Sequence, residues 1–120
     1  MPTGPSVLKE GQLYNTKSAK GDCLGLNGNT ILIQKCKTDG SDIWQELDNG
    51  EIIHKSTGKC MSTTKKNNGT PITLASCNGS DIQTWHERPT KEGKFVIESN
   101  KFANQCVDLP GGAGNVGLKT

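Results

Sequence analysis

Short apolar runs separated by glycine-containing turns occur along the whole chain. Alternating or continuous apolar runs of four to eight residues are typical of β-strands. Asn-Gly and Asp-Gly dipeptides lie between the runs and favour tight hairpin turns, which need positive φ angles. The pattern therefore predicts a nearly all-β protein of about twelve short strands. The runs are Gln12–Tyr14, Thr30–Gln34, Glu51–His54, Pro71–Ala75, Lys94–Glu98 and Asn115–Lys119.

The same succession of residues occurs three times along the chain. A tryptophan is followed by a glycine turn, an apolar strand and a cysteine, first from Trp44 and again from Trp85, 41 positions later. A weaker copy begins at Val7. A fixed period of this kind indicates three groups of about four strands in a closed or sandwich-like architecture. The tryptophans are expected to meet in a core with pseudo-threefold symmetry.

The length of 120 residues predicts one domain. We expect this domain to span residues 7–120, with repeats at approximately 7–43, 44–84 and 85–120, after a disordered leader of residues 1–6. Hydrophobic residues make up 31% of the chain and aromatic residues 4%. A core this thin would gain from covalent cross-links.

Charge and hydropathy exclude several classes of protein. The formal net charge is +2, from lysines mixed with acidic residues. The chain therefore lacks the concentrated basic surface that binding to nucleic acid requires. No apolar run reaches the 18 residues expected of a transmembrane helix, and no signal peptide pattern is present. Two N-glycosylation sequons, at Asn68 and Asn78, fit a secreted or extracellular protein whose signal has been removed.

Four of the five cysteines form two pairs on strands of local hairpins. Pairing within each repeat predicts the disulfides Cys23–Cys36 and Cys60–Cys77, and leaves Cys106 as a free thiol. Zinc is the alternative for cysteines, but no Cys-x-x-Cys motif occurs and neither histidine has metal-ligand spacing from a cysteine pair. We expect neither a metal nor a cofactor.

The segment Cys77–Trp85, with its Gln83-Thr84-Trp85 motif, resembles the signature of ricin B-type β-trefoil lectin domains. Gly58–Met61 and Asn104–Asp108 are similar to another strand of that family, which includes the cysteine-rich domains of mannose-receptor-like proteins. The segment Cys36–Trp44 keeps the spacing, with Asp42 in place of the glutamine. The resemblance covers residues 7–120 and implies a β-trefoil fold. It also implies a lectin that recognises glycans or glycoproteins without catalysis.

In this family each repeat can hold one shallow sugar site. The resemblance implies an aspartate two residues after the first cysteine, an aromatic residue on the fourth strand and an amide before the tryptophan. Together they would bind sugar hydroxyls and cover the apolar face of a galactose-like ring. Two repeats depart from this pattern: the first has Gly25, Gln34 and Asp42 at these positions, and the second has Ser62 and Ala75 but retains Gln83.

The third repeat keeps the aspartate, as Asp108, but has Lys119 in the place of the aromatic residue. We therefore expect Asp108, Asn115 and Lys119 to line the carbohydrate site, with the lysine favouring an acidic glycan. Trp44, Gln83 and Trp85 are interpreted as the core repeat motif. The alternative for the two tryptophans is a role as sugar platforms, but their phase with the repeats favours the core.

The barrel lacks a third tryptophan-bearing strand at its end. The strand Val116–Thr120 corresponds in sequence to Ile31–Lys35 and Ile72–Ser76. The N-terminal Val7–Glu10 is therefore predicted to serve as the last barrel strand. If it does not fill the space, exposed apolar surface would favour a homodimer.

Two functions remain open at this point. The first is non-catalytic binding of galactose-type, N-acetylgalactosamine-type or acidic glycans. The second is a protein-interaction trefoil, such as a receptor-tip, toxin or inhibitor module, with degenerate sugar sites. Catalysis is not expected, because neither His54 nor His86 lies near a nucleophile motif and Gly111–Gly114 lacks the residues of a phosphate-binding loop.

Overall fold

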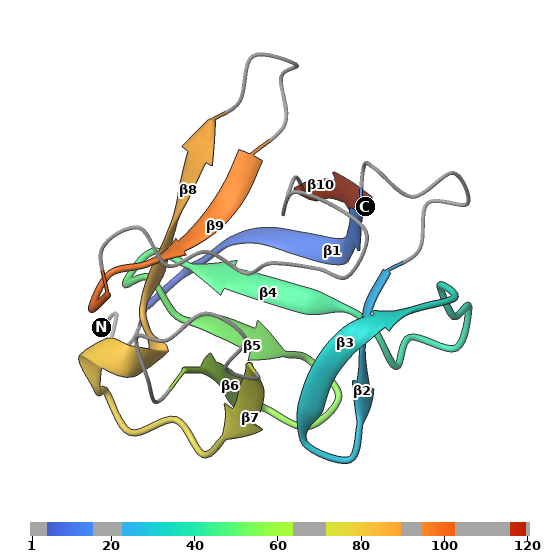
Figure 1. Cartoon of the computed structure of the whole chain (residues 1–120), viewed down its shortest axis with the longest axis horizontal. Coiled ribbons are helices and arrows are strands. Elements are labelled where there is room, and N and C mark those ends of the chain that lie inside the picture. The colour runs from blue at the N-terminus through green and yellow to red at the C-terminus, as the bar shows by residue number, and fades with distance from the viewer. Residues whose placement is uncertain (1–4, 16–22, 64–71, 90–94, 103–115, 120) are drawn as a thin grey trace.

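A computed structural model describes residues 5–15, 23–63, 72–89, 95–102 and 116–119 (Figure 1). Within these ranges the chain forms ten strands and one short 3-10 helix, which confirms the expected all-β class. No helix in this part of the chain has the length and apolar character needed to cross a membrane. The elements are β1 (Val7–Asn15), β2 (Cys23–Asn27), β3 (Thr30–Gln34), β4 (Trp44–Leu47), β5 (Ile52–His54), β6 (Lys59–Ser62), β7 (Thr73–Ala75), η1 (Asp81–Gln83), β8 (Trp85–Pro89), β9 (Phe95–Ser99) and β10 (Val116–Lys119).

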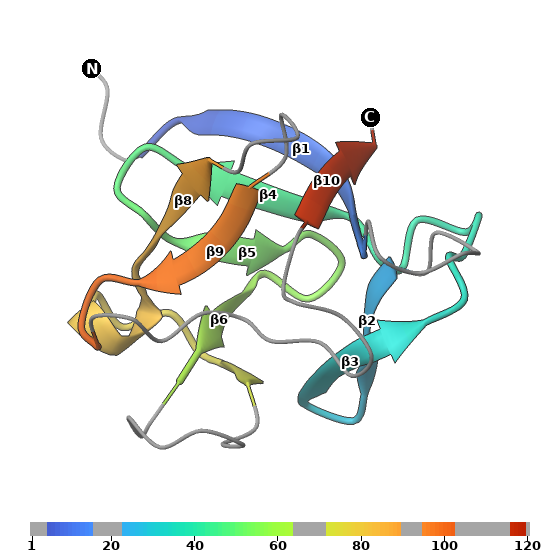
Figure 2. The same cartoon turned by 45° about the horizontal axis from the view of Figure 1, so that its top comes forward.

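Six strands follow one another in a ring. β1 pairs with β4 and β10, β4 pairs with β5, and β9 pairs with β8 and β10, all antiparallel. A single bridge between Glu51 and Thr84 and a bond of 2.8 Å from Trp85 N to Gly50 O join β5 to β8. The pairs β2–β3 and β6–β7 lie together beyond this ring and meet at Thr30 and Thr73 (Figures 1 and 2).

The structure corrects the prediction for the last barrel strand. β1 is a single strand whose residues Val7–Gly11 pair with β4, while Gln12–Asn15 pair with β10. Because Val7–Glu10 continues in line with Gln12–Asn15, it cannot also lie beside that segment as a neighbouring strand. The place between β1 and β9 is taken instead by β10, which does not pair as β3 and β7 do.

Two buried indoles form the centre of the hydrophobic core. Trp44 and Trp85 are 1% and 4% exposed, as a core role requires. Each indole Nε1 donates a hydrogen bond to a backbone carbonyl, Trp44 to Leu24 O at 3.1 Å and Trp85 to Met61 O at 3.0 Å. Both acceptors directly follow the first cysteine of their repeat, so the two contacts are equivalent. The core residues are Leu13, Leu24, Ile31, Trp44, Ile52, Met61, Leu74, Trp85 and Ile97.

Both predicted disulfides are confirmed. Cys23 is bonded to Cys36 and Cys60 to Cys77, with Cα separations of 4.9 and 5.1 Å. Each bond closes the loop of one hairpin, so the β2–β3 and β6–β7 pairs are cross-linked individually. Cys106 lies outside the described residues.

Three ionisable side chains gather at the end of the barrel that lies away from these hairpins. Glu46 and Glu87 are two residues beyond Trp44 and Trp85, and therefore on the same strand faces as the buried indoles. Lys9 is the register partner of Glu46, and its Nζ lies 2.7 Å from Glu87 Oε2. One strand from each repeat thus contributes an ionisable side chain to this group.

Glu46 is the protonated member of this group at neutral pH. Burial, together with the adjacent Glu87 carboxylate, raises the pKa of Glu46 from 4.5 to about 8. Its Oε2 atom is buried and accepts no hydrogen bond from the described residues. The neutral acid, which can donate to Glu87, is therefore favoured over a second negative charge.

We predict that the free energy of unfolding falls as the pH rises from about 5 to 9. Folding takes up a proton between the unfolded and folded pKa values of Glu46, so its contribution is complete below about pH 4.5 and is lost as the pH passes 8. Urea unfolding of Glu46→Gln should show a flatter pH dependence. Glu10→Gln is the control, because its hydrogen bond from Gln45 lowers the Glu10 pKa, away from this range. Equal slopes for wild type and Glu46→Gln would contradict the assignment.

The disulfides predict a second measurable effect on stability. Replacing Cys60 and Cys77 together with alanine should lower the free energy of unfolding by about 3 kcal/mol, since the unfolded chain regains the freedom of a closed loop. Cys106→Ala should retain both disulfides and serves as the control. Denaturant unfolding measures the loss, and thiol counting by mass spectrometry should find one free thiol in the wild type and none in Cys106→Ala. A double variant as stable as the wild type would contradict this prediction.

Candidate carbohydrate-binding sites

The first repeat has its candidate sugar position on the β2–β3 hairpin, and a side chain of the protein occupies it. Gly25 lies on β2 where the resemblance implies an aspartate, and Gln34 ends the neighbouring strand β3. A β-carbon placed on Gly25 would lie 2.0 Å from Gln34 Nε2 and 2.6 Å from Gln34 Cδ. The space that a carboxylate would need is therefore filled by the Gln34 amide.

The second repeat presents no carboxylate at the corresponding position. Ser62, at the end of β6, is 2% exposed and pairs in register with Thr73 on β7. Ala75, on β7, replaces the aromatic residue. A buried hydroxyl and a methyl group offer neither the charged acceptor nor the ring face that a galactose-like sugar needs.

Gln83 is retained in the second repeat, but its amide is used inside the protein. Its side chain is 1% exposed, accepts a hydrogen bond of 2.9 Å from Asn78 N and donates one of 2.9 Å to Ser76 O. These bonds hold the loop between β7 and β8 against the barrel. The motif Gln83-Thr84-Trp85 is thus a folding motif, and its two polar side-chain groups are not free for a ligand.

Asp42 takes the place of Gln83 in the first repeat and accepts the corresponding hydrogen bond from the loop. It is fully buried, and its Oδ2 accepts a hydrogen bond of 2.9 Å from Lys37 N, which matches the bond from Asn78 N to Gln83. A carboxylate cannot donate, and Gln12 supplies the missing donor: Gln12 Nε2 reaches Asp42 Oδ1 at 2.9 Å and Lys37 O at 2.7 Å. Sequence reasoning missed Gln12, although the loss of an amide donor at Asp42 was a signal that another must replace it.

Of the predicted site residues of the third repeat, the structure describes only the backbone of Lys119. Asp108 and Asn115 lie outside the described residues. The backbone of Lys119 lies at the end of β10, opposite Gln12 on β1. The site of Asp108, Asn115 and Lys119 stays a prediction.

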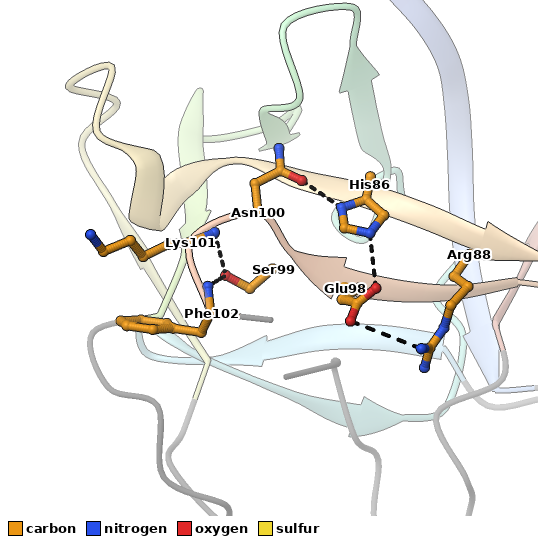
Figure 3. A network of polar contacts seen from close by, with 7 residues as sticks. All are labelled: His86, Arg88, Glu98, Ser99, Asn100, Lys101 and Phe102. Atoms are coloured by element: carbon orange, nitrogen blue, oxygen red, sulfur yellow. Dashed lines mark hydrogen bonds and ion pairs between the residues drawn. The ribbon is translucent and has the colours of Figure 1, made fainter. Parts of the chain in front are cut away.

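A polar network covers one face of the β8–β9 hairpin in this repeat (Figure 3). His86 Nε2 lies 2.9 Å from Glu98 Oε1, and Arg88 Nη1 lies 3.9 Å from Glu98 Oε2. The other ring nitrogen of His86 contacts Asn100 Oδ1, while Ser99 Oγ accepts hydrogen bonds from the next turn of backbone. The Glu98 side chain is only 10% exposed, so these contacts stabilise the hairpin rather than present an open carboxylate.

The second histidine is also held by neighbouring turns. His54 is 2% exposed, packs edge-on against Trp44 with ring centroids 5.1 Å apart, and contacts Ser41 O at 2.6 Å through Nε2. Its Nδ1 lies 3.1 Å from Thr57 Oγ1 in the turn after β5. These partners fix the ring in the core of the second repeat, which is a structural role.

The described ranges also contain a small cavity and one cluster of possible metal ligands. The cavity lies between the β4–β5 turn and the β8–β9 hairpin and has a volume of about 20 Å³, room for a water molecule and too small for a sugar ring. In the cluster, ligand atoms of Glu51, Cys60 and Cys77 lie within 4.8 Å of one another. Both sulfur atoms are in a disulfide, so they cannot bind a metal as thiolates.

About half of the chain is similar in sequence to known proteins. Human polypeptide N-acetylgalactosaminyltransferase 15 is 30% identical over 67 residues, which cover 52% of this chain and 10% of the enzyme, and the mouse enzyme matches equally. The chain therefore spans about a tenth of the length of these relatives.

Solved structures confirm the predicted β-trefoil fold. The hemolytic lectin CEL-III has a TM-score of 0.77 at 24% identity, over 98% of this chain and 28% of the lectin. The designed threefold-symmetric protein ThreeFoil has a TM-score of 0.73 at 14% identity, over 92% of this chain and 89% of the design.

The sequence profile of the ricin-type β-trefoil lectin domain matches residues 9–120, which is nearly the whole chain. A lectin domain of this kind implies carbohydrate binding in general and is usually non-catalytic. The chain belongs to the ricin-type β-trefoil lectin domain family.

Proposed function

We propose that this protein binds glycans, without catalysis, through its third repeat. The observation that carries the proposal is that the other two repeats lack an open carboxylate at the sugar position. In the first repeat the Gln34 amide fills the position beside Gly25, and in the second Ser62 has a buried hydroxyl. Asp108 is the carboxylate that the sequence keeps at this position. We infer that Asp108, Asn115 and Lys119 line the site.

The chemistry of these three side chains suits a polar sugar. A carboxylate accepts hydrogen bonds from two adjacent hydroxyls, and an amide both donates and accepts. Lys119 adds a positive charge where an aromatic ring would cover the sugar face, so a sulfate or carboxylate on the glycan would gain a charge-assisted hydrogen bond. The ligand class we propose is a galactose or N-acetylgalactosamine glycan, with preference for an acidic form.

The relatives support this class by their names alone. The human relative is an N-acetylgalactosaminyltransferase, and the structure with the highest TM-score of those compared above is a hemolytic lectin. Binding through one site is expected to be weak, and several copies would be needed for avidity. A homodimer, or a larger host protein, would supply such copies.

An extracellular setting is part of the proposal. Two disulfides form and persist in oxidising compartments, such as the secretory pathway and the cell exterior. Glycoproteins and cell-surface glycans are the partners available there.

A protein-interaction module with decayed sugar sites is the second candidate. It is favoured by the absence of an open carboxylate and an aromatic platform in two repeats, which restricts glycan binding to the third repeat. In that case the protein partner would contact loops of the trefoil without a sugar, and the third repeat would show no glycan affinity.

A glycan array separates the two candidates. We predict signal on glycans that end in galactose or N-acetylgalactosamine, with higher signal on their sulfated or sialylated forms, and loss of about 90% of it in Asp108→Asn, since one lost charge-assisted hydrogen bond is worth about 1.5 kcal/mol or more. Asp39→Asn removes the same charge from an exposed loop of the first repeat and is the matched control. Lys119→Gln should weaken binding to the acidic forms alone.

Two outcomes would contradict the proposed site. Signal that survives Asp108→Asn would place binding elsewhere on the protein. An array without signal, from protein whose disulfides are shown to be formed, would favour the protein-interaction module.

The closed first and second repeats also predict the number of sites. Calorimetric titration with sulfated N-acetylgalactosamine should give one site per chain, because Gln34 and the buried Ser62 exclude ligand from the other repeats. Gln34→Ala, which empties the space beside Gly25 without adding a carboxylate, should leave this number unchanged. A stoichiometry of two or three would show that the degenerate repeats still bind.

A further inference from the structure

The loop between β7 and η1 carries the sequon Asn78-Gly79-Ser80, to which neither the fold nor the proposed sugar site assigns a role. The loop has a fixed position, because Asn78 N donates to the buried Gln83 Oε1 at 2.9 Å and Gln83 Nε2 donates to Ser76 O. Thr63 N also donates to Ile82 O, at 3.2 Å, from the end of β6. The sequon is thus presented from a rigid base.

The Asn78 side chain is exposed, and its two polar atoms differ in their contacts. Oδ1 accepts a hydrogen bond of 2.8 Å from Ser80 N, in an Asx turn. Nδ2 has no hydrogen-bond partner among the described residues. The turn therefore fixes the carbonyl end of the amide and leaves the nitrogen, the atom that is glycosylated, free.

The space beside the sequon is open. Gly79 has a φ angle of 75°, and a β-carbon placed on it would meet no atom within 4 Å. Asn78 is itself exposed, so a substituent on its side chain has access to solvent. Surface loops are where N-linked glycans are accommodated.

Another exposed Asn-Gly turn shows a contrasting arrangement. Asn49 donates from Nδ2 to Glu51 Oε1 at 3.0 Å and accepts from Glu51 N with Oδ1, so both ends of its amide are used. It also lacks the hydroxyl residue two positions later. The free Nδ2 of Asn78 is thus not a general property of Asn-Gly turns in this fold.

The disulfide of the neighbouring cysteine indicates a compartment in which N-glycosylation can take place. Cys77, directly before Asn78, is bonded to Cys60, and disulfides of this kind form in the oxidising lumen of the secretory pathway. N-linked glycosylation takes place in the same lumen. A chain that acquires this disulfide in that lumen meets the transferase there.

We propose that Asn78 is an N-glycosylation site that carries an oligosaccharide on Nδ2. The donor is an oligosaccharide linked to a lipid diphosphate. A bond forms between Nδ2 and C1 of the first sugar while the bond from C1 to the diphosphate oxygen breaks; the lipid diphosphate leaves, and the amide loses one proton to a base of the transferase.

The fold also indicates when the transfer occurs. In the folded protein Ser80 Oγ accepts a hydrogen bond of 3.3 Å from Ile82 N and caps η1. The transferase needs this hydroxyl for itself, so the sugar is attached before the cap forms. The folded structure then keeps the glycan because Asn78 Nδ2 faces solvent.

The experiment uses the full chain, secreted from animal cells behind a cleavable signal. Intact mass before and after treatment with a peptide-N-glycosidase, with peptide mapping in heavy-oxygen water, gives the fraction of Asn78 that is modified. We expect modification of more than half of the wild-type molecules, none in Asn78→Gln or Ser80→Ala, and retention in Ser80→Thr. Asn68→Gln removes the other sequon and should leave the modification of Asn78 unchanged.

Secreted wild-type protein with both disulfides formed but Asn78 unmodified would overturn the proposal. Modification of Asn78 that persists in Ser80→Ala would overturn it as well, because the sequon hydroxyl would then be unnecessary. A variant that fails to fold is recognised by its free thiols, and the comparison between Ser80→Ala and Ser80→Thr still decides the result. The outcome is independent of whether the third repeat binds sugar.

Discussion

The contact between each buried indole and the backbone of its neighbouring hairpin is the interaction on which the rest of the fold depends. Trp44 and Trp85 fill the barrel, and their Nε1 atoms bind carbonyls on β2 and β6. Barrel and hairpins are therefore joined at the same atoms that form the core. A residue of similar size without the N-H group would fill the space and leave a buried carbonyl unpaired, which is costly.

Hydrogen bonds that hold the loops explain why the sugar-site residues cannot be inferred from the repeat motif alone. Gln83, part of the repeat motif, is buried with both ends of its amide hydrogen-bonded, and Asp42 with Gln12 provides a similar set of bonds in the first repeat. Residues that hold each loop are thus under a structural requirement that is separate from sugar binding. Sugar binding can decay in one repeat while the trefoil persists.

The strand pattern, the cysteine pairs and the core tryptophans could be predicted because each depends on local periodicity within a repeat. The place of β10 could not, since apolar runs of four residues fit several registers and only contacts with β1 and β9 decide among them. The Lys9–Glu87 ion pair joins residues 78 positions apart, and no local pattern signals it. The Gln34 amide beside Gly25 also depends on side-chain direction, which the spacing of residues does not determine.

The junction between β5 and β8 is much thinner than the junction between β8 and β9. One bridge at Glu51 and Thr84 and one further backbone bond hold it, whereas β8 and β9 share five register pairs. Local opening follows the regions with the fewest bonds. Amide protons along the β5–β8 junction would therefore exchange with solvent ahead of those between β8 and β9, and a protease would gain entry there while both disulfide-linked hairpins were still intact.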